Sequence, residues 1–422
     1  MVKDAVNNEK KNSILLILMI IAIALENFKL INVIGAPIKV THIVFIIAII
    51  NSLFLVIIKQ QFNLKYLSIY LFLIIIPLIP LYRIFDITEF MKTYVIYILM
   101  ISFLTFSYSD FSKKFKAAYM SYINMFLCII LLVQLLGIIQ FVCMNYFGYF
   151  FLDGIWGDFQ FHRSIYGMQF GLYRAYSIFH EPSFFGWVST TSFAICVYLK
   201  RKYYLKNSKY YLFQFFNILA IGVSVSASSL VIILLIYGIS ILLEIKKPVK
   251  FFILIIISCA IFYILGEFTN VFNSLERVGN EINTSETSGY ERLNTPMQYM
   301  IATFENYPLF GRGLGQEGNI DAVGVIGLYE GVHNSLFGIF VNLGLSAIVF
   351  IVYFLLFFFK KIKQNMDYVL IFTALMGIYV STGAYLSLDT FVVLVFMLLI
   401  GDLPKKEISN INIKGYSNIQ NN

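Results

Sequence analysis

Residues 180–188 read His-Glu-Pro-Ser-Phe-Phe-Gly-Trp-Val and mark the place where a polar loop becomes an apolar helix. The apolar run that follows, 183–199, has the length that a helix needs to cross the hydrocarbon core of a bilayer. Hydrophobic residues make up 59% of the 422 residues, charged residues make up only 13%, and the mean hydropathy is +0.80. Soluble domains are apolar over only about half of their residues. The composition therefore predicts an integral membrane protein.

Apolar runs of this length recur along the whole chain, and about twelve of them are expected to span the membrane as helices. Two pairs of runs are joined by short turns, Ser224 to Ser228 and Ser381 to Leu388, so about ten or eleven spans is the alternative. We expect an all-α polytopic membrane protein in which residues 1–422 form a single transmembrane domain. The expected spans are 13–32, 39–58, 66–82, 92–108, 117–143, 183–199, 209–225, 228–243, 250–265, 334–359, 367–384 and 386–401.

Basic residues predict the orientation of the chain, because short cytoplasmic loops collect Lys and Arg. With the N-terminus in the cytoplasm, the inner segments carry 22 of the 31 basic residues. Both termini are therefore expected in the cytoplasm. The net charge of +8 reflects this topology, and no nucleic-acid partner is expected. The four cysteines lack metal-ligand spacing and no His/Cys cluster stands out in the sequence, so no metal or other cofactor is expected.

Two long segments, 144–182 and 266–333, lie on the outer side in this topology, and long loops on a rigid scaffold often carry function. Aromatic residues crowd the first loop and indicate either an interfacial belt or platforms for sugar rings. The second loop contains an expected short amphipathic helix near 296–306, with Thr295 as N-cap and Pro296 at the first helical position. Its expected apolar stripe consists of Met297, Met300, Ile301 and Phe304.

Arginines concentrate on the outer side of this topology, where six of the seven are expected. A planar guanidinium binds phosphate oxygens in a bidentate manner, so an outward arginine can hold a diphosphate. The helices expected to begin near Pro182 and Asn334 also direct free N–H groups outward, where they favour anions. Contacts with lipid headgroups or local ion pairs, such as Arg83 with Asp86, are the alternative. The candidate anion-binding residues are Arg174, Arg292 and Arg312.

Three ionisable residues near these helix starts, Glu181, Glu330 and His333, are candidates for proton transfer. An imidazole takes up a proton near neutral pH. Each candidate has a structural alternative, because a helix dipole stabilises an acid at its start and a lone histidine is often a packing residue. Residues 311–315, Gly-Arg-Gly-Leu-Gly, superficially look like a nucleotide-phosphate loop, but no strand precedes them and no Lys-Ser/Thr follows.

Three short motifs occur in a fixed order. Arg174 is followed by Phe-x-Glu-Pro-Ser-x-x-Gly, ending at Gly186; Ser-Gly-x-x-Arg from Ser288 is followed by Tyr-Pro-Leu-x-Gly-x-Gly; and His333 opens His-Asn-Ser-Leu. In this order and topology they resemble the O-antigen ligase and Wzy-type polymerase superfamily of bacterial surface-polysaccharide assembly. The resemblance implies a GT-C-like polysaccharide polymerase/ligase architecture. The chain departs from this family at residues 226–229, Ser-Ala-Ser-Ser, since the family's turn there often carries a basic residue.

The resemblance implies a metal-independent glycosyltransferase of the bacterial inner membrane. Such an enzyme polymerises undecaprenyl-diphosphate-linked repeat units at the external face and releases undecaprenyl diphosphate. Its implied partners are the lipid-linked glycan, membrane lipids and a chain-length regulator protein. In this family Arg174 and Arg292 are implied to hold the diphosphate. His333 is implied to activate the acceptor hydroxyl, with Glu181 and Glu330 as rivals.

Three other functions remain open on the sequence. A ligase would move finished glycan onto lipid A core or another acceptor with the same donor chemistry. A flippase for lipid-linked oligosaccharide is disfavoured because few charges lie within the expected spans, with Asp389 the nearest exception. A structural scaffold is the remaining alternative.

Overall fold

The computed structural model describes ten stretches of the chain, and within them the backbone is mostly helical. These stretches are residues 14–25, 29–33, 36–59, 64–150, 168–169, 172–179, 181–243, 288–316, 334–381 and 386–403. The helical elements are α2 (Ile14–Ala24), α3 (Val40–Lys59), α4 (Leu64–Ile75), η1 (Ile76–Arg83), α5 (Ile87–Ser102), η2 (Phe103–Ser107), α6 (Tyr108–Ala117), α7 (Tyr119–Tyr146), α8 (Pro182–Arg201), α9 (Asn207–Ser224), α10 (Ala227–Leu242), α13 (Ser288–Asn306), α15 (Ser335–Leu343), η5 (Gly344–Ser346), α16 (Ala347–Gln364), η6 (Met366–Tyr368), α17 (Val369–Ser381) and α18 (Leu388–Ile400).

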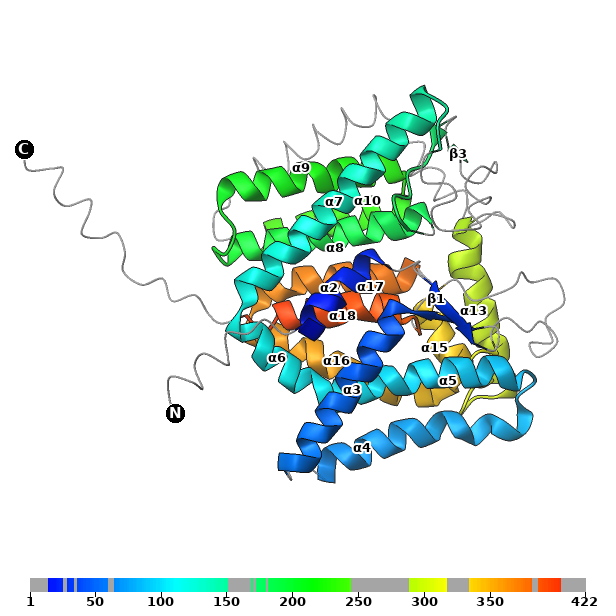
Figure 1. Ribbon diagram of the computed structural model, residues 1–422. Coiled ribbons are helices and arrows are strands. Elements are labelled where there is room, and N and C mark those ends of the chain that lie inside the picture. Colours follow the sequence, from blue (N-terminus) through cyan, green and yellow to red (C-terminus); the bar gives the residue numbers. More distant parts are fainter. Residues whose placement is uncertain are drawn as a thin grey trace, which may run out of the picture.

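The helices form three layers (Figure 1). Helices α7 to α10 lie on one side, α3, α4 and α5 lie on the opposite side, and α2, α16, α17 and α18 lie between them. Helix α13 runs across one end of this stack, from the side of α10 towards α5. The short connections between consecutive antiparallel helices explain why sequence neighbours pack together within each layer.

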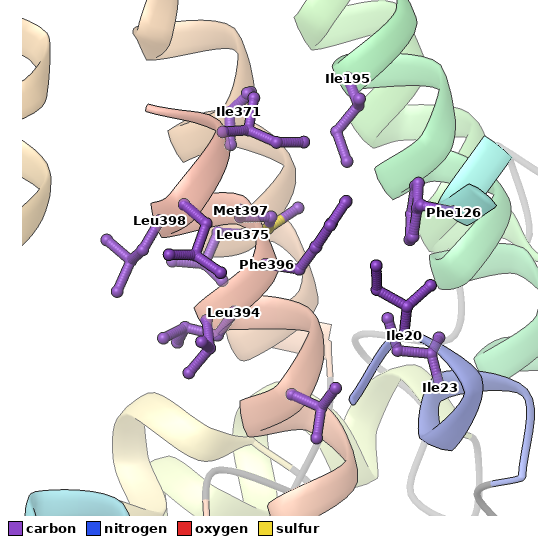
Figure 2. Packing of buried hydrophobic residues seen from close by; sticks show 14 of the residues in the cluster. Ile20, Ile23, Phe126, Ile195, Ile371, Leu375, Leu394, Phe396, Met397 and Leu398 are labelled. Atoms are coloured by element: carbon purple, nitrogen blue, oxygen red, sulfur yellow. The ribbon is translucent and has the colours of Figure 1, made fainter. Parts of the chain in front are cut away.

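Two helices, α8 and α18, form the centre of the molecule. From Pro182 to Leu199, every α8 residue except Phe184 is buried, and α18 is buried almost throughout. Figure 2 shows Phe396 of α18 pointing towards Phe126 of α7, and the two rings stack with centroids 4.3 Å apart. An all-round apolar helix can be covered by lipid or by other helices, and here other helices cover α8 and α18 on nearly all sides. The surrounding residues of this core include Ile20 and Ile23 of α2, Ile195 of α8, and Ile371 and Leu375 of α17.

Three helical stretches in the described part of the chain are long and apolar enough to cross a membrane: Ile87–Ala117, Tyr119–Tyr146 and Ser335–Gln364. Several shorter apolar helices accompany them. The expected tight turn between the seventh and eighth runs is present, because α9 ends at Ser224 and α10 begins at Ala227. Val225 makes this turn in the left-handed conformation, with φ +46°. The expected span 250–265 lies outside the described residues.

The first expected span, 13–32, is too long. Helix α2 ends at Ala24, and strand β1 (Lys29–Val33) then pairs antiparallel with β2 (Ala36–Lys39). Asn27 and Lys29 interrupt the apolar run, and the β-branched residues around them favour an extended backbone. A second short hairpin, β3 (Met168–Gln169) with β4 (Leu172–Tyr173), precedes α8.

The amphipathic helix expected near 296–306 is the second half of a longer helix, α13. It begins at Ser288, so Pro296 lies inside the helix and Thr295 is not its N-cap. The expected stripe is half right: Met300 packs against Tyr299 and Val341, and Phe304 lies 5.9 Å from the ring of Phe340, but Met297 and Ile301 are 47% and 45% exposed. Thr295, Tyr299 and Thr303 are buried instead, four residues apart on one face, and α13 packs with α15.

Basic residues and carboxylates pair at the opposite end of the stack from α13, which we call the aspartate end after Asp367 and Asp402. Arg201 and Lys202, at the C-terminal end of α8, each contact Asp367 at 2.8 Å. Lys361 of α16 contacts Asp402 at 2.5 Å, and Tyr108 and Ser112 of α6 donate hydrogen bonds to the same carboxylate. These pairs join α6, α8, α16 and α18 where the helices leave the core.

Candidate functional site

Arg174 is held in a rigid segment between β4 and α8. The side chain of Asn145, on α7, accepts a hydrogen bond from the Tyr173 amide and donates one to its carbonyl. Gln140 Oε1, one turn earlier, accepts from the amides of Tyr176 and Ser177 at 3.0 and 2.7 Å. Because the backbone on both sides of Arg174 is fixed to α7, its side chain starts from a defined position.

The guanidinium of Arg174 lies at the turn between α9 and α10. Its Nε donates to the carbonyl oxygen of Ser224 at 3.0 Å, and the neighbouring amide of Ala175 donates to Val223 O at 2.9 Å. Helix α10 begins at Ala227, so free N–H groups of its first turn lie beside the same turn. The Ser-Ala-Ser-Ser turn lacks a basic residue of its own, and Arg174 supplies one from another segment.

Glu181 occupies the N-cap position of α8, with Pro182 at the first helical position. Its side chain does not cap the helix. Glu181 Oε2 instead accepts a hydrogen bond from the Ser183 hydroxyl at 2.9 Å, and the carboxylate is half-buried. Glu181 thus lies at the helix start, as the helix-dipole alternative requires, and its carboxylate keeps oxygen lone pairs for another donor.

Gly186 brings the start of α8 against the turn of Arg174. A Cβ at this position would lie 2.5 Å from Ser229 Oγ and 2.9 Å from Ser226 Cβ, closer than atoms pack. The Glu-Pro-Ser-x-x-Gly motif and the Ser-Ala-Ser-Ser turn are thus in direct contact. Two helix N-termini, those of α8 and α10, meet beside one arginine, and both favour an anion.

An apolar depression of about 450 Å³, its open side included, lies on the next turns of α8. It is lined by side chains of α2, α8, α17 and α18 and by Phe179. Two buried donors among its lining residues, Trp187 Nε1 and Thr191 Oγ1, have no hydrogen-bond partner in the described part of the chain. Buried polar atoms normally have partners, so these two donors mark a place where a ligand oxygen would be bound favourably.

Arg312 lies in a different part of the structure, in the loop that follows α13. Its Nε donates to Thr303 Oγ1 at 3.1 Å, and its guanidinium carbon lies 5.4 Å from the centre of the Tyr307 ring. The side chain is 4% exposed. Burial lowers the pKa of Arg312 below its ordinary value. The guanidinium of Arg312 thus contacts α13 and the loop after it, whereas that of Arg174 contacts the end of α9.

Arg292 is on the first half of α13, and its backbone alone can be placed. It precedes Thr303 by eleven residues, which is about 16 Å along a helix. The joint role of Arg292 and Arg312 in holding an anion stays a prediction. His333 and Glu330 lie outside the described residues, as does His180. Asn334 Oδ1 accepts from the amides of Leu336 and Phe337, so Asn334 caps α15, as the sequence indicated.

The comparison with protein families identifies the chain. A family model described as WcaD colanic acid polymerase matches residues 14–401. The chain belongs to this family. Membership confirms the resemblance to Wzy-type polymerases, and with the long apolar helices it shows an integral membrane protein of polysaccharide biosynthesis with glycosyltransferase-type activity. No curated protein matches the chain.

Sequence reasoning missed the contact between Arg83 and Tyr307 in this member of the WcaD family. Arg83 was paired with Asp86 as the alternative to anion binding, but its guanidinium donates to Gly311 O and stacks on Tyr307. Asp86 caps α5 by accepting from the amides of Thr88 and Glu89. Arg83 and Tyr307 are more than 220 residues apart, and no sequence signal indicates that they are in contact. Within the described residues, no group of three or more His, Cys, Asp or Glu side chains could hold a metal ion.

Proposed function

We propose that this chain polymerises undecaprenyl-diphosphate-linked repeat units into surface polysaccharide at the external face of the bacterial inner membrane. The observation that carries the proposal is the fixed guanidinium of Arg174 at the meeting point of α8, α9 and α10, in a chain of a polymerase family. In this proposal both termini are cytoplasmic, about twelve spans cross the membrane, and the loops 144–182 and 266–333 are external. The end of the stack that carries Arg83, Arg174 and Arg312, which we call the arginine end, then faces outward.

The donor in this reaction is a growing glycan linked through a diphosphate to a polyprenyl lipid. The acceptor hydroxyl oxygen forms a bond to the anomeric carbon of the donor, while the bond from that carbon to the diphosphate oxygen breaks. Negative charge grows on the leaving diphosphate. Arg174 and the N-terminal amides of α8 and α10 are suited to stabilise this charge, because fixed donors need no rearrangement during the reaction.

The acceptor hydroxyl must lose its proton. Among the residues that the structure describes, Glu181 is the candidate for the base. Its carboxylate is half-buried, follows the segment that carries Arg174, and accepts one side-chain hydrogen bond there, from Ser183. His333 and Glu330, which precede α15 in the chain, are the other candidates. A base contributes about 10²- to 10⁴-fold to such a reaction.

The apolar depression supports a lipid-borne substrate. Phe184, Trp187 and Val188 place it within two turns of Glu181, on the same helix. A polyprenyl chain could lie against these side chains while its diphosphate reaches Arg174. Such contacts gain free energy in proportion to the apolar area that they cover.

The proposal is tested with a strain that lacks this gene and is complemented with variants at matched membrane levels. Surface polysaccharide is separated on a gel. We expect wild type and Lys92→Ala, an exposed residue at the arginine end, to restore the long-chain ladder. Arg174→Ala is expected to lower polymer formation by about 100-fold or more, leaving single repeat units. Arg292→Ala and His333→Ala test the residues that the family resemblance adds.

Other gel patterns would contradict the proposal. Long chains stranded on undecaprenyl diphosphate in the deletion strain would indicate a ligase. Repeat units trapped on the cytoplasmic face would indicate a flippase. A ladder that does not change on deletion would exclude all three activities.

A further inference from the structure

Two arginines from distant parts of the chain stack on one tyrosine ring at the arginine end. The guanidinium carbon of Arg83, at the end of η1, lies 4.4 Å from the centre of the Tyr307 ring, and that of Arg312 lies 5.4 Å from it. Arg83 is also 5.6 Å from the ring of Tyr82. An aromatic face attracts a cation, so Tyr307 allows two like charges to approach each other.

The contacts of Arg83 fix its position without cancelling its charge. It donates to the carbonyl oxygen of Gly311, and its buried Nε has no hydrogen-bond partner among the described residues. A neutral carbonyl satisfies a hydrogen bond but contributes no opposite charge, whereas a carboxylate would do both. The partly exposed guanidinium of Arg83 therefore keeps a charge that can attract an anion, and its buried Nε is an unsatisfied donor.

The loop that carries Arg312 is clamped from two sides. The amides of Arg312 and Gly313 donate to the carbonyls of Val341 and Asn342 in α15, at 2.9 and 3.0 Å. Gly311 has φ +62°, and a Cβ there would lie 2.5 Å from the Asn342 backbone, so only glycine fits. Gln316 bonds to the backbone of Phe85 and Asp86, next to Arg83. The two arginines are consequently held at a fixed separation before any ligand binds.

The chemistry of these groups selects the ligand. The guanidiniums of Arg83 and Arg312 lie beside one ring and concentrate positive charge there, which suits an anion with several oxygens. A phosphate or diphosphate ester meets this need better than one carboxylate. Both arginines lie where helices of the stack end, which is the depth of lipid headgroups if α5 and α15–α16 cross the membrane.

We propose that Arg83, Tyr307 and Arg312 form a second phosphate-binding site, separate from Arg174, which holds the diphosphate of the acceptor lipid-linked repeat unit. The assignment to the acceptor rests on the proposed polymerase function, because a polymerase must hold two lipid diphosphates at once. Arg174 and the start of α8 would hold the donor. The headgroup of an ordinary phospholipid offers the same phosphate chemistry and is the other source to be distinguished.

The test counts bound lipids by native mass spectrometry of the full-length protein in detergent, titrated with undecaprenyl diphosphate. We expect two bound lipids for wild type and one for Arg174→Ala. One is also expected for Arg83→Gln, which keeps a donor for Gly311 but loses the charge. The affinity of the second lipid should fall about tenfold or more, the effect of losing one charged hydrogen-bonding group. Lys92→Gln, an exposed residue of α5, should still bind two. Arg83→Lys repeats the test should Arg83→Gln not fold.

Three outcomes would overturn the inference. In the first, wild type binds a single lipid, Arg174→Ala binds none, and the wild-type protein still polymerises. The proposed function would then stand without the second site. Arg83→Gln could fold and still bind two lipids. Phosphatidylglycerol at equal concentration could displace the second undecaprenyl diphosphate, which would make the site one for bulk phospholipid. If instead the expected lipid counts are found but polymer formation does not depend on the protein, the proposed function fails and the site remains.

Discussion

The two ends of the helix stack use basic side chains in different ways. At the aspartate end, Lys361 pairs with Asp402, and Arg201 and Lys202 share Asp367. At the arginine end, Arg174 donates to a backbone carbonyl and Arg83 donates to another while stacking on tyrosine rings. An internal carboxylate cancels the charge that it holds in place. The carbonyl of Gly311 and the ring of Tyr307 hold the charge of Arg83 in place and leave it able to attract an anion.

The difference separates stability from function. Ion pairs between helices stabilise the assembled fold when both partners are buried, and removing one partner leaves an uncompensated charge. Cations fixed by neutral groups contribute less to folding and are positioned for a ligand instead. The exposed Lys92–Glu89 pair on α5 shows that acids are also present near the arginine end. The contrast therefore concerns the contacts of individual arginines and not the overall composition of each end.

The largest expected effect is at the aspartate end. Asp402→Asn leaves Lys361, whose side chain is 6% exposed, without its carboxylate. We expect the free energy of unfolding in detergent to fall by about 3–5 kcal/mol, the usual loss for breaking a buried ion pair. Polymerisation per folded molecule should change little, in contrast to Arg174→Ala. A double variant, Lys361→Met with Asp402→Leu, should recover much of the stability. A stable Asp402→Asn protein with lost activity would reverse the proposed division between the two ends.

A smaller effect is expected at the contact between the two motifs of the arginine end. Gly186→Ala places a methyl group 2.5 Å from Ser229 Oγ, so α8 must move away from the turn that holds Arg174. We expect a loss of about 1–3 kcal/mol in the free energy of unfolding and a lower polymerisation rate. Gly238→Ala on α10 is the matched control, because no atom lies within 4 Å of its added Cβ. There, alanine should stabilise the helix by up to about 1 kcal/mol. Equal behaviour of the two variants would show that the contact has no functional role.

The smallest effect is a pH dependence that belongs to the aspartate end. Burial alone would raise the pKa of Asp402, but the charge of Lys361 and the hydrogen bonds from Lys361, Tyr108 and Ser112 outweigh it and lower the pKa below the ordinary 3.8. A lowered pKa in the folded state gives stability that is present above the unfolded pKa and is lost as pH falls through the folded one. Wild type should therefore lose stability below about pH 4 relative to Asp402→Asn, as measured by unfolding at a series of pH values. A difference in the free energy of unfolding that stays constant with pH would exclude the Asp402 carboxylate as the source of the pH dependence.

Periodicity and apolar length predicted most helix positions in the described part of the chain, and turn chemistry predicted the break between α9 and α10. These features depend on residues close together in the sequence. The predicted end of α2 and the predicted start of α13 were wrong. Local signals such as Asn27 or Pro296 compete with packing against distant segments, which a short stretch of sequence does not reveal. The buried face of α13 was partly wrong for the same reason. Met300 and Phe304 pack against α15 as expected, but Met297 and Ile301 are exposed, and Tyr299 and Thr303 are buried instead.

Residue chemistry selected Arg174, Glu181 and Arg312 as candidate site residues. The sequence grouped Arg174, Arg292 and Arg312 as anion-binding residues and Glu181 as a candidate for proton transfer, and these roles remain predictions. Only the fold shows which arginines lie together. Arg174 contacts the end of α9, Arg312 contacts α13, and Arg83 lies near Arg312 although more than 220 residues separate them in the sequence. His333 and Glu330 lie outside the described residues and stay candidates.

The sequence by itself determined that this protein is an apolar, helical membrane protein of a polysaccharide polymerase family, because composition and short motifs depend only on residue identity and local order. The tertiary structure decided which helices are central, which arginines share a site and which cations are paired with carboxylates. Those properties arise from contacts between segments far apart in the chain, such as Gly186 with Ser229 and Arg83 with Tyr307. The free energy of such contacts depends on distance in space, which residue order alone does not specify.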